Sequence, residues 1–388
     1  MKKTTYFYTL LLLLAALLVA CGGATTEEPD APAPEEEAAP AAIVVEEAEE
    51  EAAPTATVVE EAEEEAAPTA TVVEEAEEVV EEEVAEESMA GFPVTIDNCG
   101  LSITYDAPPE HAVTMNQAAT ELMLALGLED KMVGTAYIDD EILPEYADAY
   151  ASVPVLSDKY PSQEVLFASE PDFVYGVYRS AFGDEAAGSR EELNGLGIGS
   201  YLSEVACEDE ALRPDKATFD TVYDEIRNIG LIFGVEDRAE ALIADMEAQL
   251  DASLVMMADQ EVPTRIFWYD SGDDEPFVGA CCGTPGMIID ALGAENIFAD
   301  AEGNWATVSW EEVVERNPDA IVIIEADWSP AQDKIDLLLN DPLFETVTAV
   351  KEQNFVVIPF SATTLGVRNV QAVTDLATGL GTMSTESE

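Results

Sequence analysis

The sequence predicts an α/β protein with two lobes, each built on a sheet rich in parallel strands, joined by one long linking helix. Three observations predict this fold. Short β-branched runs alternate with amphipathic stretches, which is typical of parallel sheets covered by helices. Two phrases of sequence occur twice, once in each half of the folded region. A stretch with helical spacing and no proline separates the two halves.

The predicted strands are the β-branched runs. The first half contains "HAVTM", "KMVGTA" and "DFVYG", and the second half contains "TRIFWYD", "AIVII" and "NFVVIP". Open α/β sheets bind ligands beyond the carboxyl ends of their strands. Two such sheets that face one another therefore predict a ligand cleft between the lobes.

The linking helix is predicted over 236–260, because apolar residues recur there at helical spacing and the next proline is Pro263. This helix places the first lobe at 91–235 and the second lobe at 261–388. The first lobe opens with "FPVTIDNCGLSITY", which has the pattern of a β-hairpin.

The repeated phrases predict where helices start and stop. "SQEVLFASEPDFVYG" begins at Ser162 and "SWEEVVERNPDAIVI" begins at Ser309, and each serine is placed to cap a helix. Ser309 and Glu312 also have the spacing of a capping box. The second repeated phrase is an amphipathic stretch that ends in Ala-Leu-Gly, at Gly127 and again at Gly293. Glycine at that place favours a left-handed helix end.

The N-terminus predicts export. Residues 1–20 contain two lysines and then an apolar run that falls short of the roughly 20 residues a membrane-spanning helix needs, so we interpret them as a signal peptide. Leu18-Val19-Ala20-Cys21 resembles the lipobox of bacterial lipoproteins, in which the cysteine is lipidated and becomes the mature N-terminus. An ordinary signal with an incidental cysteine is the alternative.

Residues 21–90 are predicted to form a disordered acidic tether behind the lipidated cysteine. A repeated unit starts at Ala38, Ala52 and Ala66, and each copy holds a proline and an acidic cluster. Proline interrupts helices and like charges repel one another, while the valine pairs are too few to offset chain entropy. An extended tether is favoured over a docking array, because no copy contains an aromatic or basic residue.

The charge of the folded region excludes some partners. Residues 91–388 hold 57 acidic and 13 basic residues, because the preceding part contains 25 acidic residues and two lysines. Such a surface rejects nucleic acid and anionic lipid headgroups. It suits high salt, where screening weakens self-repulsion, although an acidic outer environment would also fit.

Several chemistries are excluded by the residues that are missing. His111 is the only histidine, which excludes a multi-histidine zinc or manganese site. A lone histidine also disfavours a Ser-His-Asp hydrolase, and neither a G-x-S-x-G elbow nor a P-loop is present. We therefore predict no enzyme activity, no resident metal and no cofactor, although a metal can arrive inside a chelate.

The cysteines after Cys21 are four, and an even number in an exported protein permits disulfides. Cys99 lies in the predicted hairpin turn and Cys207 in a later loop of the same lobe, so we expect these two to pair. For the adjacent Cys281 and Cys282, a strained disulfide, free thiols near a ligand and buried small side chains are all open. The sequence has no C-x-x-C spacing, so it does not indicate a structural zinc site.

The order of these features carries a family resemblance. The lipobox, the opening hairpin, "APPEHAVTMNQAATELMLALG", the doubled phrase and the linking helix together resemble the class III periplasmic binding proteins. The resemblance implies a monomeric, lipid-anchored extracytoplasmic receptor that delivers an iron–siderophore, haem or cobalamin to an ABC permease and its ATPase. It also implies that Glu164 and Glu311, one in each lobe, dock onto arginines of the permease. The helix dipole, which favours first-turn glutamates, is the alternative explanation.

The candidate ligand-binding residues follow the predicted strands. Lys159, Arg179 and Arg368 are cations at strand ends, so we expect a bulky anionic chelate held between aromatic walls. The predicted site consists of Asn116, Gln117, Tyr137, Lys159, Tyr160, Tyr178, Arg179, Trp305, Trp328 and Arg368. The alternative is that these aromatics are core and these cations are ordinary loop charges. Four other cations are interpreted as solvated helix charges: Arg190, Arg227, Arg238 and Arg316.

Three alternative functions are carried with this prediction. "GVRNV" near the C-terminus resembles helices of relatives assigned to deazaflavin-cofactor precursors, so a corrinoid or deazaflavin-type ligand is possible. A chelatase-like enzyme shares the two-lobed architecture but typically relies on histidine. A surface adhesin would use the tether and would leave the repeated lobe phrases unexplained.

Overall fold

The computed structural model describes residues 91–257 and 263–386, without the side chains of residues 384–386. The described fold belongs to the second of the two units into which the chain divides, Glu82–Glu388. The predicted signal peptide, Cys21 and the predicted tether lie outside the described residues.

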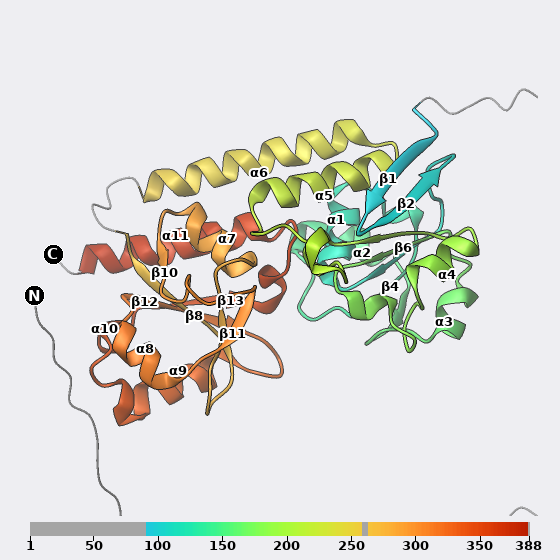
Figure 1. Cartoon of the computed structure of the whole chain (residues 1–388). Coiled ribbons are helices and arrows are strands. Elements are labelled where there is room, and N and C mark those ends of the chain that lie inside the picture. The colour runs from blue at the N-terminus through green and yellow to red at the C-terminus, as the bar shows by residue number, and fades with distance from the viewer. Residues whose placement is uncertain (1–90, 258–262, 387–388) are drawn as a thin grey trace, which may run out of the picture. The chain divides into compact units, whose positions relative to one another are not determined.

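The first lobe combines a hairpin with a parallel sheet (Figure 1). The hairpin pairs β1 (Val94–Asn98) with β2 (Leu101–Tyr105), as the sequence predicts. The sheet has the order β5-β4-β3-β6-β7, with all neighbours parallel. Its strands are β3 (Ala112–Met115), β4 (Met132–Ala136), β5 (Val155–Ser157), β6 (Phe173–Gly176) and β7 (Gly199–Leu202). The sequence analysis did not predict β5 and β7, because "VLS" is very short and "GSYL" begins with small residues.

The helices of the first lobe cover both faces of this sheet. They are α1 (Gln117–Ala125), α2 (Ala147–Tyr150), α3 (Gln163–Ala168), α4 (Arg190–Gly195) and α5 (Phe219–Ile232). A short 3-10 helix, η3 (Arg179–Phe182), follows β6. β3 leads into α1. The loops that follow β4, β5 and β6 face the second lobe.

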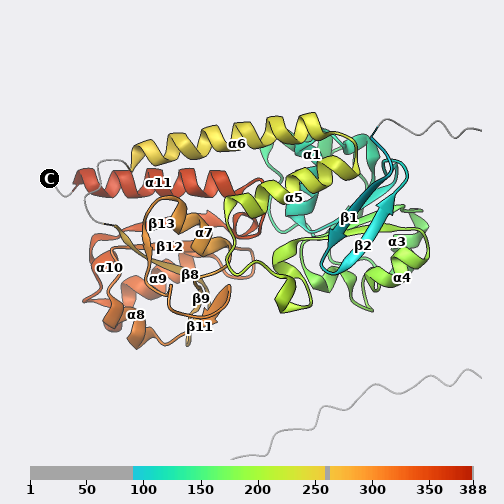
Figure 2. The same cartoon turned by 45° about the horizontal axis from the view of Figure 1, so that its top comes forward.

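The linking helix is α6 (Glu236–Met256), which starts where the sequence predicts and ends earlier than Gln260. It buries Ala239, Ile243 and Met246, which lie three or four residues apart on one face. Figures 1 and 2 show α6 running alongside both lobes, where it packs on α5 at one end and on α11 at the other.

The second lobe is built on a mixed sheet of order β11-β9-β8-β12-β13, with β10 paired to β8. β8, β10, β12 and β13 are parallel, whereas β9 and β11 form an antiparallel ribbon that the sequence analysis missed. The strands are β8 (Arg265–Ser271), β9 (Phe277–Gly279), β10 (Glu295–Asn296), β11 (Trp305–Thr307), β12 (Ala320–Glu325) and β13 (Phe355–Pro359). The helices are α7 (Thr284–Ala291), α8 (Trp310–Arg316), α9 (Ala331–Asn340), α10 (Thr348–Glu352) and α11 (Asn369–Glu386), with the 3-10 helix η7 (Phe360–Thr363) after β13.

The repeated phrases start and stop helices as predicted, with one exception. Ser162 Oγ accepts the Val165 N–H at 3.4 Å, and Ser309 Oγ accepts the Glu312 N–H at 3.2 Å. The predicted capping box at Ser309 is wrong, because the Glu312 carboxylate accepts from Arg316 rather than from the backbone of Ser309. The glycines at the two Ala-Leu-Gly phrases adopt left-handed φ angles of 63° and 65°.

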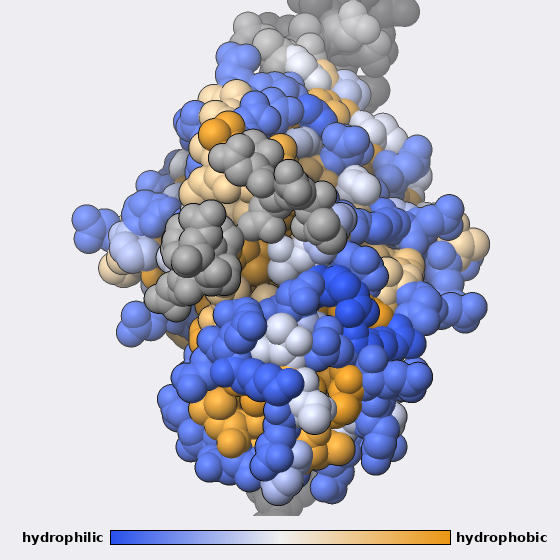
Figure 3. All heavy atoms as spheres, turned by 90° about the vertical axis from the view of Figure 1, so that its left-hand side faces the viewer, coloured by the Kyte–Doolittle hydropathy of each residue, from blue (hydrophilic) through white to orange (hydrophobic). Residues whose placement is uncertain are grey.

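The face of the second lobe drawn in Figure 3 is rich in hydrophilic residues. Figure 3 shows that the end of the second lobe carries mostly hydrophilic residues, with small apolar patches between them. Among the described residues, none of the helices is both long enough and apolar enough to span a bilayer.

Candidate ligand-binding cleft

Two neighbouring pockets lie between the lobes, beyond the carboxyl ends of the strands of both sheets. The larger pocket has a volume of about 930 Å³ and the smaller pocket about 500 Å³. The larger pocket is lined by Asn116, Tyr137, Asp139, Lys159, Tyr160, Tyr178, Ser180, Gly183, Asp184, Glu185, Ala186, Trp328 and Phe360. The smaller pocket is lined by Val177, Tyr178, Arg179, Ser180, Val205, Ala206, Arg213, Asp270, Phe277, Gly283, Thr284, Asn304, Trp305, Phe360, Thr363, Thr364 and Leu365.

Aromatic side chains form much of the larger pocket. Tyr137 and Tyr160 meet edge to face with ring centroids 4.7 Å apart, and the Lys159 ammonium lies 4.3 Å from the centroid of the Tyr137 ring. From the second lobe, Trp328 meets Phe360 at 4.6 Å, and the Trp328 side chain is 57% exposed. A large exposed tryptophan at a pocket mouth leaves an aromatic face available to a ligand.

Hydrogen bonds hold this aromatic wall in place, and two of its residues have a strained backbone. The Tyr160 hydroxyl donates to Asn116 Oδ1 at 3.2 Å and lies 3.1 Å from Ser180 Oγ. Burial raises the pKa of the Tyr160 phenol, so this hydroxyl keeps its proton at neutral pH. Asn116 and Tyr137 have φ angles of 79° and 60°. A left-handed backbone is unfavourable for a residue as bulky as tyrosine, and such strain concentrates at functional sites.

The smaller pocket has a different character. Trp305 stacks on Phe277 with ring centroids 5.5 Å apart and planes inclined by 15°. Arg179 and Arg213 both line this pocket, whereas Lys159 is the only cation among the described residues that line the larger pocket. The two pockets therefore share a wall but differ in charge.

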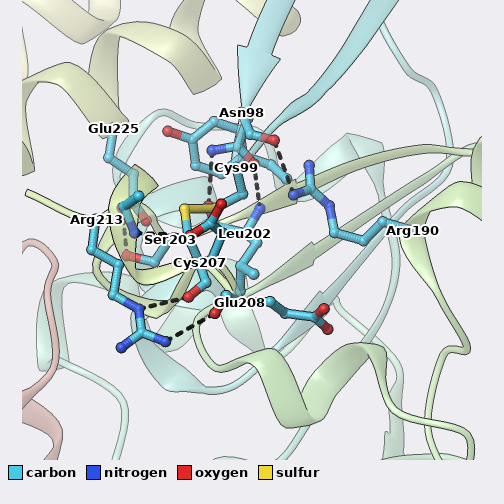
Figure 4. Close-up of a disulfide and its surroundings, with 12 residues drawn as sticks. Asn98, Cys99, Arg190, Leu202, Ser203, Cys207, Glu208, Arg213 and Glu225 are labelled. Atoms are coloured by element: carbon cyan, nitrogen blue, oxygen red, sulfur yellow. Dashed lines mark hydrogen bonds between the residues drawn. A yellow bond between two sulfur atoms is a disulfide. The ribbon is translucent and has the colours of Figure 1, made fainter.

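The disulfide of the first lobe positions one of these arginines. Cys99 and Cys207 are joined, which is the pair that the sequence predicts. Arg213 Nε donates to the Cys207 carbonyl at 2.6 Å and Nη2 donates to the Glu208 carbonyl at 3.3 Å (Figure 4). The loop closed by the disulfide thus fixes the Arg213 guanidinium at the edge of the smaller pocket.

The placement of Arg368 corrects the sequence analysis. Arg368 lines neither pocket, because its side chain is buried and bonded to Glu121 through Nε, at 2.6 Å from Glu121 Oε2. Its Nη2 also donates to the Glu141 carbonyl at 2.5 Å. Arg368 belongs to the second lobe and Glu121 to the first, so this pair ties the lobes together. The buried glutamate in the otherwise apolar "ATELMLA" was the available signal that a cation would be drawn to it.

Gln117 also has a positioning role rather than a place on a pocket wall. It is buried, and its Oε1 accepts the Asp140 N–H at 2.8 Å while its Nε2 donates to the Glu141 carbonyl at 3.2 Å. These bonds hold the loop after β4. Asp140 in turn accepts the Ser361 N–H at 2.7 Å, so this loop contacts the second lobe.

The interpretation of Arg190 as a solvated helix charge is wrong. Arg190 is 7% exposed, and Figure 4 shows its guanidinium directed at the end of β1. It donates to the Asn98 carbonyl at 3.2 Å and to Ser200 Oγ at 3.1 Å. Arg190 thus supplies hydrogen bonds to backbone carbonyls that are buried where the hairpin meets β7.

Some site residues were missed by sequence reasoning. Phe360 lines both pockets and directly follows the predicted strand "NFVVIP", so the rule that ligands bind beyond strand ends could have found it. Arg213 and Asp139 lie in loops and Ser180 lies in η3, and none of the three has a distinguishing sequence pattern. Thr284 begins α7, and a helix start beside a predicted cleft was a weak signal for it.

Three further predictions concern residues outside the pockets. Glu164 and Glu311 are exposed in the first turns of α3 and α8, and the described residues offer neither carboxylate a hydrogen bond or ion pair. Cys281 and Cys282 are joined as a vicinal disulfide, one of the three states left open. The described part of the chain contains no group of three or more His, Cys, Asp or Glu side chains arranged for a metal ion.

Comparison with known proteins decides the family. The sequence pattern of the family described as periplasmic binding protein matches residues 113–362. The chain belongs to this family. The resemblance predicted from the sequence is therefore confirmed, and the chain is a solute-binding protein.

Two relatives of this periplasmic binding protein have informative names. An uncharacterized ABC transporter substrate-binding lipoprotein, YvrC of Bacillus subtilis strain 168, is 26% identical over 303 residues, which cover 76% of this chain and 88% of the relative. A vitamin B12-binding protein of Pectobacterium atrosepticum is 30% identical over 252 residues, which cover 61% of this chain and 83% of the relative.

Solved structures confirm the predicted fold class. A periplasmic binding protein from Veillonella parvula has a TM-score of 0.65 and 34% identity, and the match covers 75% of this chain and 97% of that one. A protein of an ABC-type Fe3+-hydroxamate transport system from Saccharomonospora viridis has a TM-score of 0.62 and 26% identity, and covers 75% and 99% of the two chains.

Proposed function

We propose that this protein is the extracytoplasmic receptor of an ABC importer and that it captures a bulky metal chelate of the iron–siderophore class. The observation that carries the proposal is the larger pocket, which opens between two lobes and is walled by aromatic rings. Its volume of about 930 Å³ is near the top of the range for small-molecule sites. The Fe3+-hydroxamate name of the Saccharomonospora structure supports the same ligand class.

A corrinoid is the second candidate ligand. The observation in its favour is the vitamin B12-binding relative in Pectobacterium, which is 30% identical. A corrinoid also offers a broad ring system to the aromatic walls. Both candidates are metal complexes, so neither needs a metal site made by the protein.

Native mass spectrometry of the full chain tests this proposal. The protein is exposed to an extract of its own growth medium, and the mass of the bound species is compared with ferrichrome and cyanocobalamin added separately. We expect a one-to-one complex with a metal-containing small molecule. Turnover of the bound species, or no retained small molecule from any source, would contradict a receptor function.

We further propose that Glu164 and Glu311 dock the protein onto its permease. Each is an exposed first-turn glutamate, in α3 of the first lobe and α8 of the second, and Figure 1 shows both helices on the side away from α6. Carboxylates without a partner in the protein are available to arginines of another protein. Two equivalent carboxylates, one per lobe, suit a permease made of two similar halves.

The double variant Glu164→Ala/Glu311→Ala tests the docking. We expect unchanged ligand affinity, and uptake through the reconstituted permease reduced at least tenfold, since charged interface pairs cost about 2–5 kcal/mol when one partner is removed. The matched control is Glu191→Ala/Glu315→Ala, which removes one exposed glutamate from α4 and one from α8. Equal uptake by both double variants would assign the first-turn glutamates to helix stabilisation alone.

Membrane attachment through lipidated Cys21 is the last part of this proposal. The lipobox pattern and the lipoprotein name of the Bacillus relative support it. One acyl chain gives only marginal membrane binding, so multiple acylation is expected. A Cys21→Ser variant should leave the membrane fraction, and its firm retention there would exclude this anchor.

A further inference from the structure

The two pockets differ in how their charges are arranged. In the larger pocket, Lys159 faces three carboxylates, those of Asp139, Asp184 and Glu185. In the smaller pocket, Arg179 and Arg213 accompany a single carboxylate, that of Asp270. In a folded region this acidic, two arginines on one pocket wall are a strong local concentration of positive charge.

Arg179 is distinctive among the cations. The other lysines and arginines within the described ranges contact a carboxylate, a carbonyl, a hydroxyl or an aromatic ring through their charged groups. Within those same ranges, no hydrogen bond, ion pair or ring contact engages the Arg179 guanidinium, although acidic residues surround the fold. An arginine left without a protein partner on a pocket wall is available to a ligand oxyanion.

A second observation comes from the start of α7, which reaches the same pocket. Thr284 is the first residue of this eight-residue helix, is only 6% exposed, and lines the smaller pocket. Its hydroxyl has no hydrogen-bond partner in the described part of the chain. The first N–H groups of a helix also lack partners within the helix and favour negative charge. A hydroxyl without a protein partner on the pocket wall, beside such a helix end, is available to a ligand acceptor.

The other charged groups of the smaller pocket are Arg213 and Asp270. The disulfide loop fixes Arg213 beside the pocket, although Arg213 also pairs with Glu210 at 3.3 Å. Asp270 is the opposing charge, and it accepts a hydrogen bond from Ser271 at 2.9 Å. Burial raises the pKa of the Asp270 carboxyl.

We propose that the smaller pocket is an oxyanion subsite, which binds a carboxylate or phosphate group on an arm of the ligand while the larger pocket binds the body. Arg179 and Thr284 are its specificity-determining residues. The assignment of the body rests on the proposed function, whereas the anion subsite stands on the groups of the smaller pocket alone. The ligand's negative charge then lies in its arm, because the body faces three carboxylates in the larger pocket.

Matched pairs of probes test the subsite with the full chain. Cyanocobalamin and dicyanocobinamide share the corrin ring, but only cyanocobalamin carries a phosphodiester. Haem and its dimethyl ester share the porphyrin, but only haem carries carboxylates. Arg179→Gln should weaken the acidic member of a bound pair by about 10- to 100-fold and change the other member less than twofold. Thr284→Val should produce a smaller loss with the same selectivity, and Arg227→Gln, on an exposed helix face, should change neither.

A second arm needs no chelate. In protein labelled with 15N-arginine, the Arg179 Nε–H signal is identified by its disappearance in Arg179→Gln and followed on addition of inorganic phosphate or citrate. We expect a saturable shift that Thr284→Val weakens and that Trp328→Ala, in the larger pocket, preserves. Phosphate and citrate distinguish a phosphate-bearing arm from a carboxylate-bearing one.

The outcomes separate the two proposals. If the anions shift Arg179 but no chelate binds, the subsite stands and the proposed ligand classes are wrong. If chelates bind and Arg179→Gln weakens both members of a pair equally, with no saturable shift by either anion, the subsite is wrong and the receptor function stands. If neither arm gives a signal, both proposals are overturned.

Discussion

The two lobes share an architecture and two phrases of sequence, but their interiors differ. The first lobe buries polar groups: Glu225 accepts hydrogen bonds from Tyr175 and from Ser203, and the Cys99–Cys207 disulfide lies close by (Figure 4). The second lobe contains an aromatic cluster around Trp310. Trp310 meets Tyr269 at 5.0 Å and Phe344 at 4.9 Å between ring centroids.

This difference shows what the repeated phrases encode. They place a serine cap at the start of a helix and a left-handed glycine at the end of another, in both lobes. They do not determine what fills the core, because the interior of the first lobe holds the hydrogen-bonded Glu225 and that of the second lobe holds the cluster around Trp310. The repetition therefore concerns backbone geometry and the exposed helix starts, where the proposed docking glutamates lie.

The largest effect on stability is expected at the Arg368–Glu121 pair, which joins the two lobes. Arg368→Met would leave the Glu121 carboxylate buried without its partner, and we expect the free energy of unfolding to fall by about 3–5 kcal/mol. Urea denaturation measures this loss. Arg227→Met, which removes an exposed ion pair, is the control and should cost about 0–1 kcal/mol. Similar losses for the two variants would mean that the lobes are not coupled through this pair.

The two disulfides give the next comparison between the lobes. Cys99 and Cys207 are separated by 108 positions, whereas Cys281 and Cys282 are neighbours. Removing a cross-link that closes a long loop should cost about 2–4 kcal/mol, because the unfolded chain regains the freedom that the loop had lost. Replacing both Cys281 and Cys282 by serine should cost far less by this mechanism. Denaturation of the two double variants side by side measures the difference, and the reverse order would refute the loop-entropy explanation.

The buried acid of the first lobe, Glu225, predicts that stability depends on pH. Burial raises the pKa of Glu225 to about 7, from an ordinary value of 4.5. Between these values the folded state retains a proton that the unfolded state has released. The free energy of unfolding therefore falls as pH rises through this window, by at most about 1.4 kcal/mol per pH unit, and the contribution levels off above pH 7.

Glu225→Gln should remove this slope, because the amide does not titrate. Glu236→Gln, at the exposed start of α6, serves as the control and should keep it. Thermal or urea unfolding at several pH values between 4.5 and 7 measures both variants. The Glu225 contribution is the difference in unfolding free energy between the wild type and Glu225→Gln. If this difference rises with pH through this range, the buried carboxyl is not protonated.

The smallest effect distinguishes the two glycine caps. Gly127→Ala and Gly293→Ala each place a side chain at a left-handed φ, which costs about 1–2 kcal/mol. At Gly127 the added Cβ would also lie 3.3 Å from Arg238 Nη1, which donates to the Gly127 carbonyl, whereas nothing lies within 4 Å at Gly293. We expect the larger loss at Gly127, and a larger loss at Gly293 would show that the contact with Arg238 does not add to the cost of backbone strain.

Sequence reasoning succeeded where local chemistry decides structure. The β-branched runs became β3, β4, β6, β8, β12 and β13, and the serines and glycines of the repeated phrases took their predicted helix-end roles. Strand ends also located most of the cleft, because a parallel sheet gathers its loops at one edge. Tyr137 and Trp328 reached the larger pocket for this reason.

The failures have a common cause in long-range pairing. Arg368 looked like a ligand-binding cation because it follows a strand, but Glu121, 247 positions away in the sequence, is buried and takes it. Arg190 looked exposed on a helix, but the hairpin brings the Asn98 carbonyl to it. Neither partner can be recognised before the fold is known, and the division of the cleft into two pockets also depends on loops from both lobes.

The acidity of the surface has a kinetic consequence for capture. The folded region carries 57 acidic and 13 basic residues, so an anionic solute is repelled once it comes within about a Debye length of the surface, about 8 Å at physiological ionic strength. Added salt should therefore raise the association rate constant of an anionic ligand, the reverse of the usual steering of a solute toward a protein of opposite charge. A neutral ligand should bind at a rate that salt hardly changes. The receptor is thus suited to collecting charged solutes where ions are abundant.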